Sequence, residues 1–124
     1  MGTTFWAGRS GTSYEFHVYP IGTEFLPISG IYIFCRQLPS TLLGGTFEAL
    51  YVGEAQSLYD RLNAGIRNHD GFKRASYAGM THIAAMRCDS AERLRIETDL
   101  RHGLDPACNR QPVPSLAELL YPNG

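Results

Sequence analysis

Two runs of β-branched and aromatic residues dominate the first half of the chain, at positions 30–36 and 47–52. This composition is typical of β-strands. The segment that joins them contains Pro39, Gly44 and Gly45, which are residue types that favour turns and loops. We therefore predict an antiparallel pair of strands here, and this pair limits the folds that the rest of the chain can complete.

A helix is predicted after the second strand. Ser57 and Asp60 match the Ser-x-x-Asp pattern that opens helices. An apolar stripe at helical spacing follows and is formed by Leu58, Leu62 and Ile66. We expect Gly71 to lie beyond the end of this helix, and a loop to run from there through Lys73 and Arg74.

A third strand is predicted over residues 81–88, which are largely apolar. A second helix is expected to follow, with Asp89 as its cap and Glu92 completing the capping box. Gly103 and Pro106 are predicted to stop this helix, since glycine and proline commonly follow helix ends.

The predicted order is strand, strand, helix, strand, helix. We therefore expect an α+β fold, in which a small antiparallel or mixed sheet of about three strands is flanked by helices. The N-terminal extension, residues 1–29, could add an edge strand over 14–20, and a proline-rich tail occupies residues 110–124. Residues 1–124 are interpreted as a single domain with a core at about 30–109.

Composition places the chain among ordinary globular proteins, with 44% hydrophobic and 19% charged residues. No apolar run has the length of a membrane span, and the first residues lack the order of a signal peptide, so a cytoplasmic location is the default expectation. The cysteines Cys35, Cys88 and Cys108 show no CxxC spacing, which argues against a zinc site or a disulfide framework. We expect all three to be reduced and structural.

Two tripeptides and four polar residues form a pattern that has the spacing of a known site. They are Gly30-Ile31-Tyr32, Tyr51-Val52-Gly53, Arg61, His69, Glu97 and Asn109. With this pattern the chain resembles the GIY-YIG endonuclease family over about residues 30–109. The resemblance implies an endonuclease that hydrolyses phosphodiester bonds in nucleic acid, with a tyrosine as general base and one divalent ion, Mg²⁺ or Mn²⁺.

The resemblance also implies roles for individual residues. Tyr32 would be the general base, and Tyr51 would orient a phosphate or metal-bound solvent. A phenol with a pKa near 10 is a poor base unless cations lower that pKa, so Arg61 belongs to the same mechanism. Arg61 lies eight residues after Gly53, as the phosphate-binding arginine of the family does. Gly30 and Gly53 are expected to allow close backbone approach beside the tyrosines.

Glu97 stands out by helical geometry alone. At about 100° per residue it projects into the apolar arc of the second helix, an arc formed by Ala91, Leu94, Ile96, Leu100 and Leu104. A buried carboxylate must be paired, neutral or bound to a metal. A salt bridge to an arginine and a metal site explain this position equally well, and the resemblance implies the metal site, because the family binds its ion through a single glutamate.

His69 and Asn109 fit the pattern less closely. Many members of the family carry a histidine four residues after the arginine, where this chain has Gly65. His69 comes one turn later and could contact Tyr32 or a phosphate. A solvated histidine at a helix end is the alternative. Asn109 could bond the tyrosine-bearing strand or a phosphate oxygen, and its role is expected to be architectural.

Nucleic acid is the expected partner, with DNA favoured over RNA. The formal net charge of −1 counts against it, but ten of the eleven basic residues are arginines, which suit bidentate phosphate contacts. We expect Arg61, Arg67, Lys73 and Arg74 to line one side of a groove. Two alternatives stay open, a non-catalytic nucleic-acid-binding module and a protein-interaction domain with a protein partner, and the chain could also form a homodimer.

Overall fold

A five-stranded antiparallel sheet forms the centre of the structure, a computed structural model that describes residues 2–39 and 46–109. The strand order in space is β1-β2-β5-β3-β4, and every neighbouring pair is antiparallel. The strands are β1 (Thr3–Ala7), β2 (Ser13–Pro20), β3 (Gly30–Gln37), β4 (Phe47–Ala55) and β5 (His82–Arg87). The proline-rich tail and residues 40–45 of the predicted strand link lie outside the described residues.

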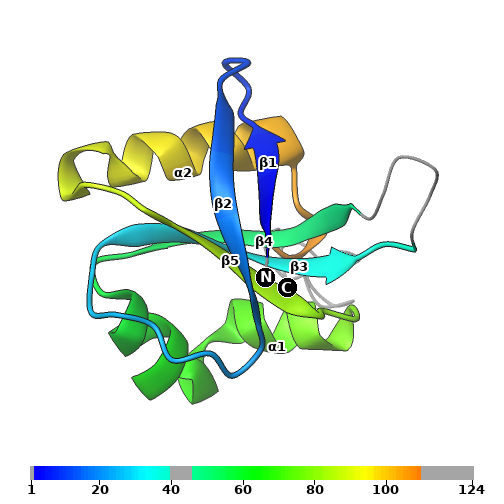
Figure 1. Cartoon of the computed structure of the whole chain (residues 1–124), viewed down its shortest axis with the longest axis vertical. Coiled ribbons are helices and arrows are strands. Elements are labelled where there is room, and N and C mark those ends of the chain that lie inside the picture. Colours follow the sequence, from blue (N-terminus) through cyan, green and yellow to red (C-terminus); the bar gives the residue numbers. More distant parts are fainter. Residues whose placement is uncertain (1, 40–45, 110–124) are drawn as a thin grey trace, which may run out of the picture.

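Helical elements cover both faces of this sheet (Figure 1). They are the π-helical turn η1 (Asp60–Ala64), the 3₁₀ turns η2 (Ile66–Asn68) and η3 (Ala107–Asn109), and the α-helices α1 (Asp70–Tyr77) and α2 (Ser90–Leu104). α2 packs on one face through Ile96 and Leu100. η1 and α1 pack on the other face through Leu62 and Ala75. Because β3 lies between the two layers, all its residues from Gly30 to Cys35 are buried.

The predicted sheet of about three strands in the order β-β-α-β-α is wrong. Residues 1–29 contribute two strands, and β2 lies between β1 and β5 rather than at an edge. The alternating burial of β2 reflects one covered face, and such a pattern does not reveal whether a strand has neighbours on both sides. β1 buries only Trp6, so its five residues carry almost no hydrophobic periodicity from which to predict a strand.

The predicted first helix is also different in the structure. The hydroxyl of Ser57 accepts a hydrogen bond from the amide of Asp60 at 3.2 Å, as the cap pattern indicates. However, the amide of Gly65 bonds the carbonyl of Asp60, five residues back, and the chain leaves helical geometry at His69. α1 then begins at Asp70 and ends at Tyr77, so the part of the predicted loop that contains Lys73 and Arg74 is helical.

α2 begins where the sequence indicates and ends between Gly103 and Pro106, the two residues predicted to stop it. Asp89 occupies the N-cap position, but no side-chain hydrogen bond caps the helix there. The helix continues through Gly103 to Leu104, and Asp105 ends it in the left-handed conformation with φ 45°. A Cβ at position 103 would lie 2.5 Å from the backbone of Gly8, so glycine at this position lets α2 pack directly against the end of β1.

The three cysteines Cys35, Cys88 and Cys108 are free and buried, which agrees with the structural role expected of them. Among the residues that the structure describes, no helix is long and apolar enough to cross a membrane.

Candidate active site

Four of the predicted site residues meet between the sheet and its η1–α1 layer. The rings of Tyr32 on β3 and Tyr51 on β4 stack with centroids 6.1 Å apart. His69, which connects η2 to α1, places its ring 5.6 Å from Tyr32 and 5.2 Å from Tyr51. Arg61 of η1 lies close enough to interact with both phenol groups. The arrangement thus combines a cation, an imidazole and two phenols in one cluster.

Glycine makes room for this cluster at two points. Gly53 faces Tyr32 across the β3–β4 ladder, and a Cβ there would lie 2.3 Å from Cζ of the tyrosine. Gly71, in the first turn of α1, would place a Cβ 2.5 Å from the ring of Tyr51. Gly30 is equally confined, but its close neighbour is the carbonyl oxygen of Met86 rather than a tyrosine. Gly53 and Gly71 are therefore the glycines that shape the cluster.

The hydrogen bonds of His69 determine its tautomer. Nδ1 accepts a hydrogen bond from the amide of Phe72 at 3.1 Å, as an N-cap of α1 does. A neutral imidazole has one N–H, which must then be on Nε2. Nε2 lies 2.6 Å from the hydroxyl oxygen of Tyr32, so His69 donates to that oxygen. The histidine is fully buried, and the alternative of a solvated helix-end histidine is wrong.

Burial controls the protonation of the same pair. It lowers the pKa of His69 to about 4, with the positive charge of Arg61 acting in the same direction. Burial also raises the pKa of Tyr32, whose side chain is 1% exposed, and the neighbouring Tyr51 adds to this effect. Arg61 opposes it, because a cation favours the phenolate. At neutral pH His69 is uncharged and Tyr32 keeps its proton.

Arg61 has no acidic partner in the part of the chain that the structure describes. The ion pairs found there join other residues, and none places a carboxylate within 4.0 Å of this guanidinium. Burial lowers its pKa and the hydroxyls of Tyr32 and Tyr51 raise it, the second effect being larger. A partly buried cation that is surrounded by phenols rather than carboxylates is suited to receive an anion.

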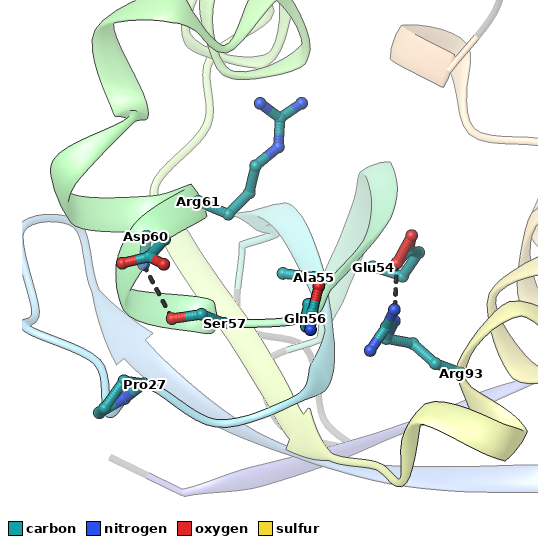
Figure 2. Close-up of a pocket in the computed structure, with 8 residues that line it drawn as sticks. All are labelled: Pro27, Glu54, Ala55, Gln56, Ser57, Asp60, Arg61 and Arg93. Atoms are coloured by element: carbon teal, nitrogen blue, oxygen red, sulfur yellow. Dashed lines mark hydrogen bonds and ion pairs between the residues drawn. The ribbon is translucent and has the colours of Figure 1, made fainter.

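A hollow of about 830 Å³ opens beside Arg61, where β4 ends (Figure 2). Its lining consists of Pro27, Glu54, Ala55, Gln56, Ser57, Asp60, Arg61 and Arg93. In Figure 2 the guanidinium of Arg61 points away from Asp60, whereas Arg93 reaches from α2 to Glu54. The hollow therefore has an arginine on each of two sides.

Glu97 is not part of the four-residue cluster, since it projects from α2, which covers the other face of the sheet. Its side chain is 13% exposed, and an oxygen of its carboxylate lies 3.5 Å from Nη1 of Arg101. Burial raises the pKa of Glu97, Arg101 opposes this, and the negative charge of Glu54 adds to it. The predicted apolar arc is only partly correct, because Ile96 is buried while Leu94 is 63% exposed.

The structure gives Glu97 the arginine partner that one of its two predicted explanations requires, so a metal ion would have to compete with Arg101. Within residues 2–39 and 46–109 no group of three or more His, Cys, Asp or Glu is arranged to hold a metal ion, so any ion there would depend on water for most of its ligands. Mg²⁺ accepts such a site, because it retains much of its water shell. Burial and the charge of Glu54 make the ionised carboxylate of Glu97 unfavourable, so a nearby cation stabilises it. In the structure that cation is Arg101.

Three predicted phosphate-binding residues lie elsewhere. Arg67 is exposed on η2, and the ammonium of Lys73 is 3.9 Å from Asp70. Nε of Arg74 donates to the carbonyl of Cys108 at 3.0 Å. None of the three lines the hollow beside Arg61.

Asn109 bonds the tyrosine-bearing strand. Its Oδ1 accepts from the amide of Val52 at 2.6 Å, and its Nδ2 donates to the carbonyl of the same residue at 2.8 Å. Val52 is the neighbour of Tyr51 on β4, the edge strand. Asn109 therefore fixes the backbone that carries the second phenol.

Sequence reasoning missed Glu54 and Arg93. Nε of Arg93 donates to Glu54 at 2.8 Å, and its Nη1 donates to the hydroxyl of Ser29 at 2.9 Å. Two signals were present in the sequence. Glu54 directly follows Gly53, and Arg93 precedes Glu97 by four residues and so shares its side of the helix.

Comparisons of the chain with protein-family models, with curated proteins and with solved structures find no match. The resemblance to GIY-YIG enzymes is therefore carried only by the two tripeptides and the polar residues that follow them. Any function assigned to the site depends on its own geometry and chemistry.

Proposed function

We propose that this protein is a metal-dependent endonuclease similar to GIY-YIG enzymes, which hydrolyses phosphodiester bonds in nucleic acid. The observation that carries the proposal is Arg61, a cation without a carboxylate partner among the described residues, which lies beside two phenols and opens onto a hollow. A phosphodiester supplies the single negative charge and the paired oxygens that a guanidinium binds best.

In the proposed reaction water attacks the phosphorus and the bond to the leaving oxygen breaks. Arg61 neutralises the charge that develops on the phosphate oxygens. Tyr32 first loses its own proton to solvent, and the N–H of His69 stabilises the resulting phenolate, since a hydrogen bond to the charged form favours it. The phenolate then takes a proton from the attacking water, and the leaving oxygen takes a proton from solvent. Tyr51, which is partly exposed, orients the phosphate or the attacking water.

A divalent ion, Mg²⁺ or Mn²⁺, would be held by Glu97, which interacts electrostatically with Glu54 in the wall of the hollow, and the ion would supply Lewis-acid stabilisation when bound. The raised pKa of Glu97 supports this role, because burial and Glu54 both make its isolated charge unfavourable. We favour DNA over RNA as substrate. Three free, buried cysteines agree with a reducing compartment such as the cytoplasm.

Cleavage of supercoiled plasmid and of labelled single strands, with Mg²⁺ or Mn²⁺ and with EDTA as control, tests the proposal. We expect ion-dependent nicking that is lost in Arg61→Gln and retained in Arg9→Gln, since Arg9 lies in the exposed turn between β1 and β2. Equal activity of the two variants would indicate a contaminating nuclease.

A non-catalytic nucleic-acid-binding module is the second candidate. It is favoured by the 1% exposure and the raised pKa of Tyr32, because a general base must reach the attacking water and must lose its proton. Salt-sensitive binding of nucleic acid without any cleavage in Mn²⁺ would support this candidate over the enzyme.

A further inference from the structure

Arg93 faces the same hollow as Arg61 but comes from a different part of the chain. It belongs to α2, whereas Arg61 belongs to η1 on the other side of the sheet. The side chain of Arg93 is 15% exposed, and that of Glu54, its acidic partner, is 27% exposed. Figure 2 shows the two arginines on separate sides of one opening.

The hollow has room for more than one phosphate. Its volume of about 830 Å³ is in the upper part of the roughly 300–1,000 Å³ range of ligand sites. A single phosphate at Arg61 would leave most of this space unfilled. A nucleic-acid strand that enters the hollow must bring a second phosphate with it, because its phosphates are spaced regularly along the backbone.

We propose that Arg93 is a second phosphate-binding residue, which holds the phosphate next to the one at Arg61 on the same strand. The inference rests on the proposed function. It adds the requirement that the substrate strand extends at least one phosphate beyond the scissile bond. Two cations at fixed positions would also set the direction in which the strand crosses the end of β4.

The hydrogen bonds of Arg93 support this role. The guanidinium donates from Nε to Glu54 and from Nη1 to Ser29. Its third nitrogen, Nη2, takes part in neither of these two hydrogen bonds. Glu54 reduces the local positive charge, but together with Ser29 it holds the guanidinium in one orientation before a ligand arrives. A preorganised donor loses less conformational freedom on binding.

The alternative is that Arg93 only ties α2 to β4. Two probes separate the roles, the thymidine dinucleotide with one phosphodiester and the trinucleotide with two. Binding is measured in EDTA by NMR titration, so that cleavage does not interfere. Because a hydrogen bond to a charged group is involved, the second phosphate should improve wild-type affinity about tenfold.

We expect Arg93→Gln to lose this gain while dinucleotide affinity stays within about twofold. Arg95→Gln is the matched control, since Arg95 lies on the same helix and pairs with Glu92 on an exposed surface. The double variant Glu54→Gln/Arg93→Gln removes both charges of the buried pair and keeps the test valid if the single variant is unstable.

Two results would overturn the inference while leaving the proposed function intact. One is a folded Arg93→Gln protein that keeps the trinucleotide gain, and the other is an equal loss of affinity for both probes. Failure of the wild-type protein to bind either probe would overturn the proposed function as well. Arg61→Gln separates these cases, because it should weaken dinucleotide binding strongly, whereas Arg93→Gln should not.

Discussion

The hydroxyl oxygen of Tyr32 lies 2.6 Å from Nε2 of His69, while the other ring nitrogen of His69 caps α1. One imidazole thus connects the start of a helix to the phenol at the centre of the candidate site. Any change that unwinds the first turn of α1 should also alter the donor that faces Tyr32.

The protein should become less stable as the pH is lowered, because of His69. The pKa of the histidine is about 4 in the folded protein and near 6.5 in the unfolded chain. Between these values the unfolded chain binds a proton that the folded protein does not, so stability is present above pH 6.5 and is lost as the pH falls toward 4. The loss should reach ~3 kcal/mol.

Urea unfolding of the wild type and of His69→Asn, from pH 4 to 7.5, measures this effect. Asparagine can still cap α1, and it does not titrate. The stability difference between the two proteins should be largest above pH 6.5 and should shrink below it. A constant difference over the whole range would mean that His69 has an ordinary pKa.

Tyr32→Phe should slow the chemical step far more than it weakens binding. The ring still packs, but the hydroxyl that would take the proton is gone, and general-base assistance contributes roughly a hundredfold to ten-thousandfold. Tyr51→Phe should cost less if that phenol only orients phosphate or water. Single-turnover cleavage compares the two, and the reverse order would assign the base to the more exposed Tyr51.

Nucleic-acid affinity should fall steeply with salt, and Arg61 should account for part of this dependence. Loss of one phosphate contact in Arg61→Gln should lower the salt slope by about one unit. Fluorescence anisotropy at several salt concentrations measures the slope, with Arg9→Gln as the control in an exposed turn. Identical slopes for wild type and Arg61→Gln would remove the phosphate contact from the mechanism.

Local patterns in the sequence indicated which side chains lie together better than they indicated the sheet. Tyr32 and Tyr51 lie on one face of the sheet, an arrangement that follows from the alternation of side chains along two neighbouring strands and is therefore a local property. The position of β2 inside the sheet depends on pairing with β5, more than sixty residues away, and alternation cannot indicate which strands pair.

The burial of His69 could not be predicted from the sequence either. Interpreting the segment as one continuous helix left two alternatives for this histidine, a contact with Tyr32, which the structure confirms, and a solvated helix end, which it does not. The amide of Gly65 instead closes a π-type turn on Asp60, and the chain bends so that His69 begins a new helix under the sheet. A helix break of this kind follows from packing of the neighbouring turns, which periodicity does not report.

Glu97→Gln should weaken binding of Mn²⁺ while the protein stays folded, because an amide is a poor ligand for hard cations. The partner left behind, Arg101, has a 45% exposed side chain, so its lost pair should cost less than about 1 kcal/mol. Arg101→Gln should do the opposite and raise Mn²⁺ affinity, since it removes the cation that competes for the carboxylate. Water-proton relaxation during Mn²⁺ titration measures both, and unchanged affinity in Glu97→Gln would exclude this residue as the ligand.

Gly53→Ala should destabilise the protein by about 1–3 kcal/mol, as overpacking of a filled core does. The added methyl group would lie 2.3 Å from Cζ of Tyr32 and would force the ring away from His69. Gly2→Ala is the control, because a Cβ there meets nothing within 4 Å. Chemical denaturation compares the two, and equal stabilities would show that the Tyr32 ring can move without cost.

The amide of Asn109 has the same donor and acceptor as a peptide group, and it occupies both hydrogen-bonding positions of Val52 on the outer side of β4. An exposed strand edge is a template on which another chain can add a strand. Because Asn109 occupies the backbone groups of Val52, near the middle of β4, this strand cannot extend the sheet into a neighbouring molecule in continuous register. Among the described residues, Asn109 therefore blocks strand addition at this point of the strand that carries Tyr51, while the end of β4 opens onto the hollow.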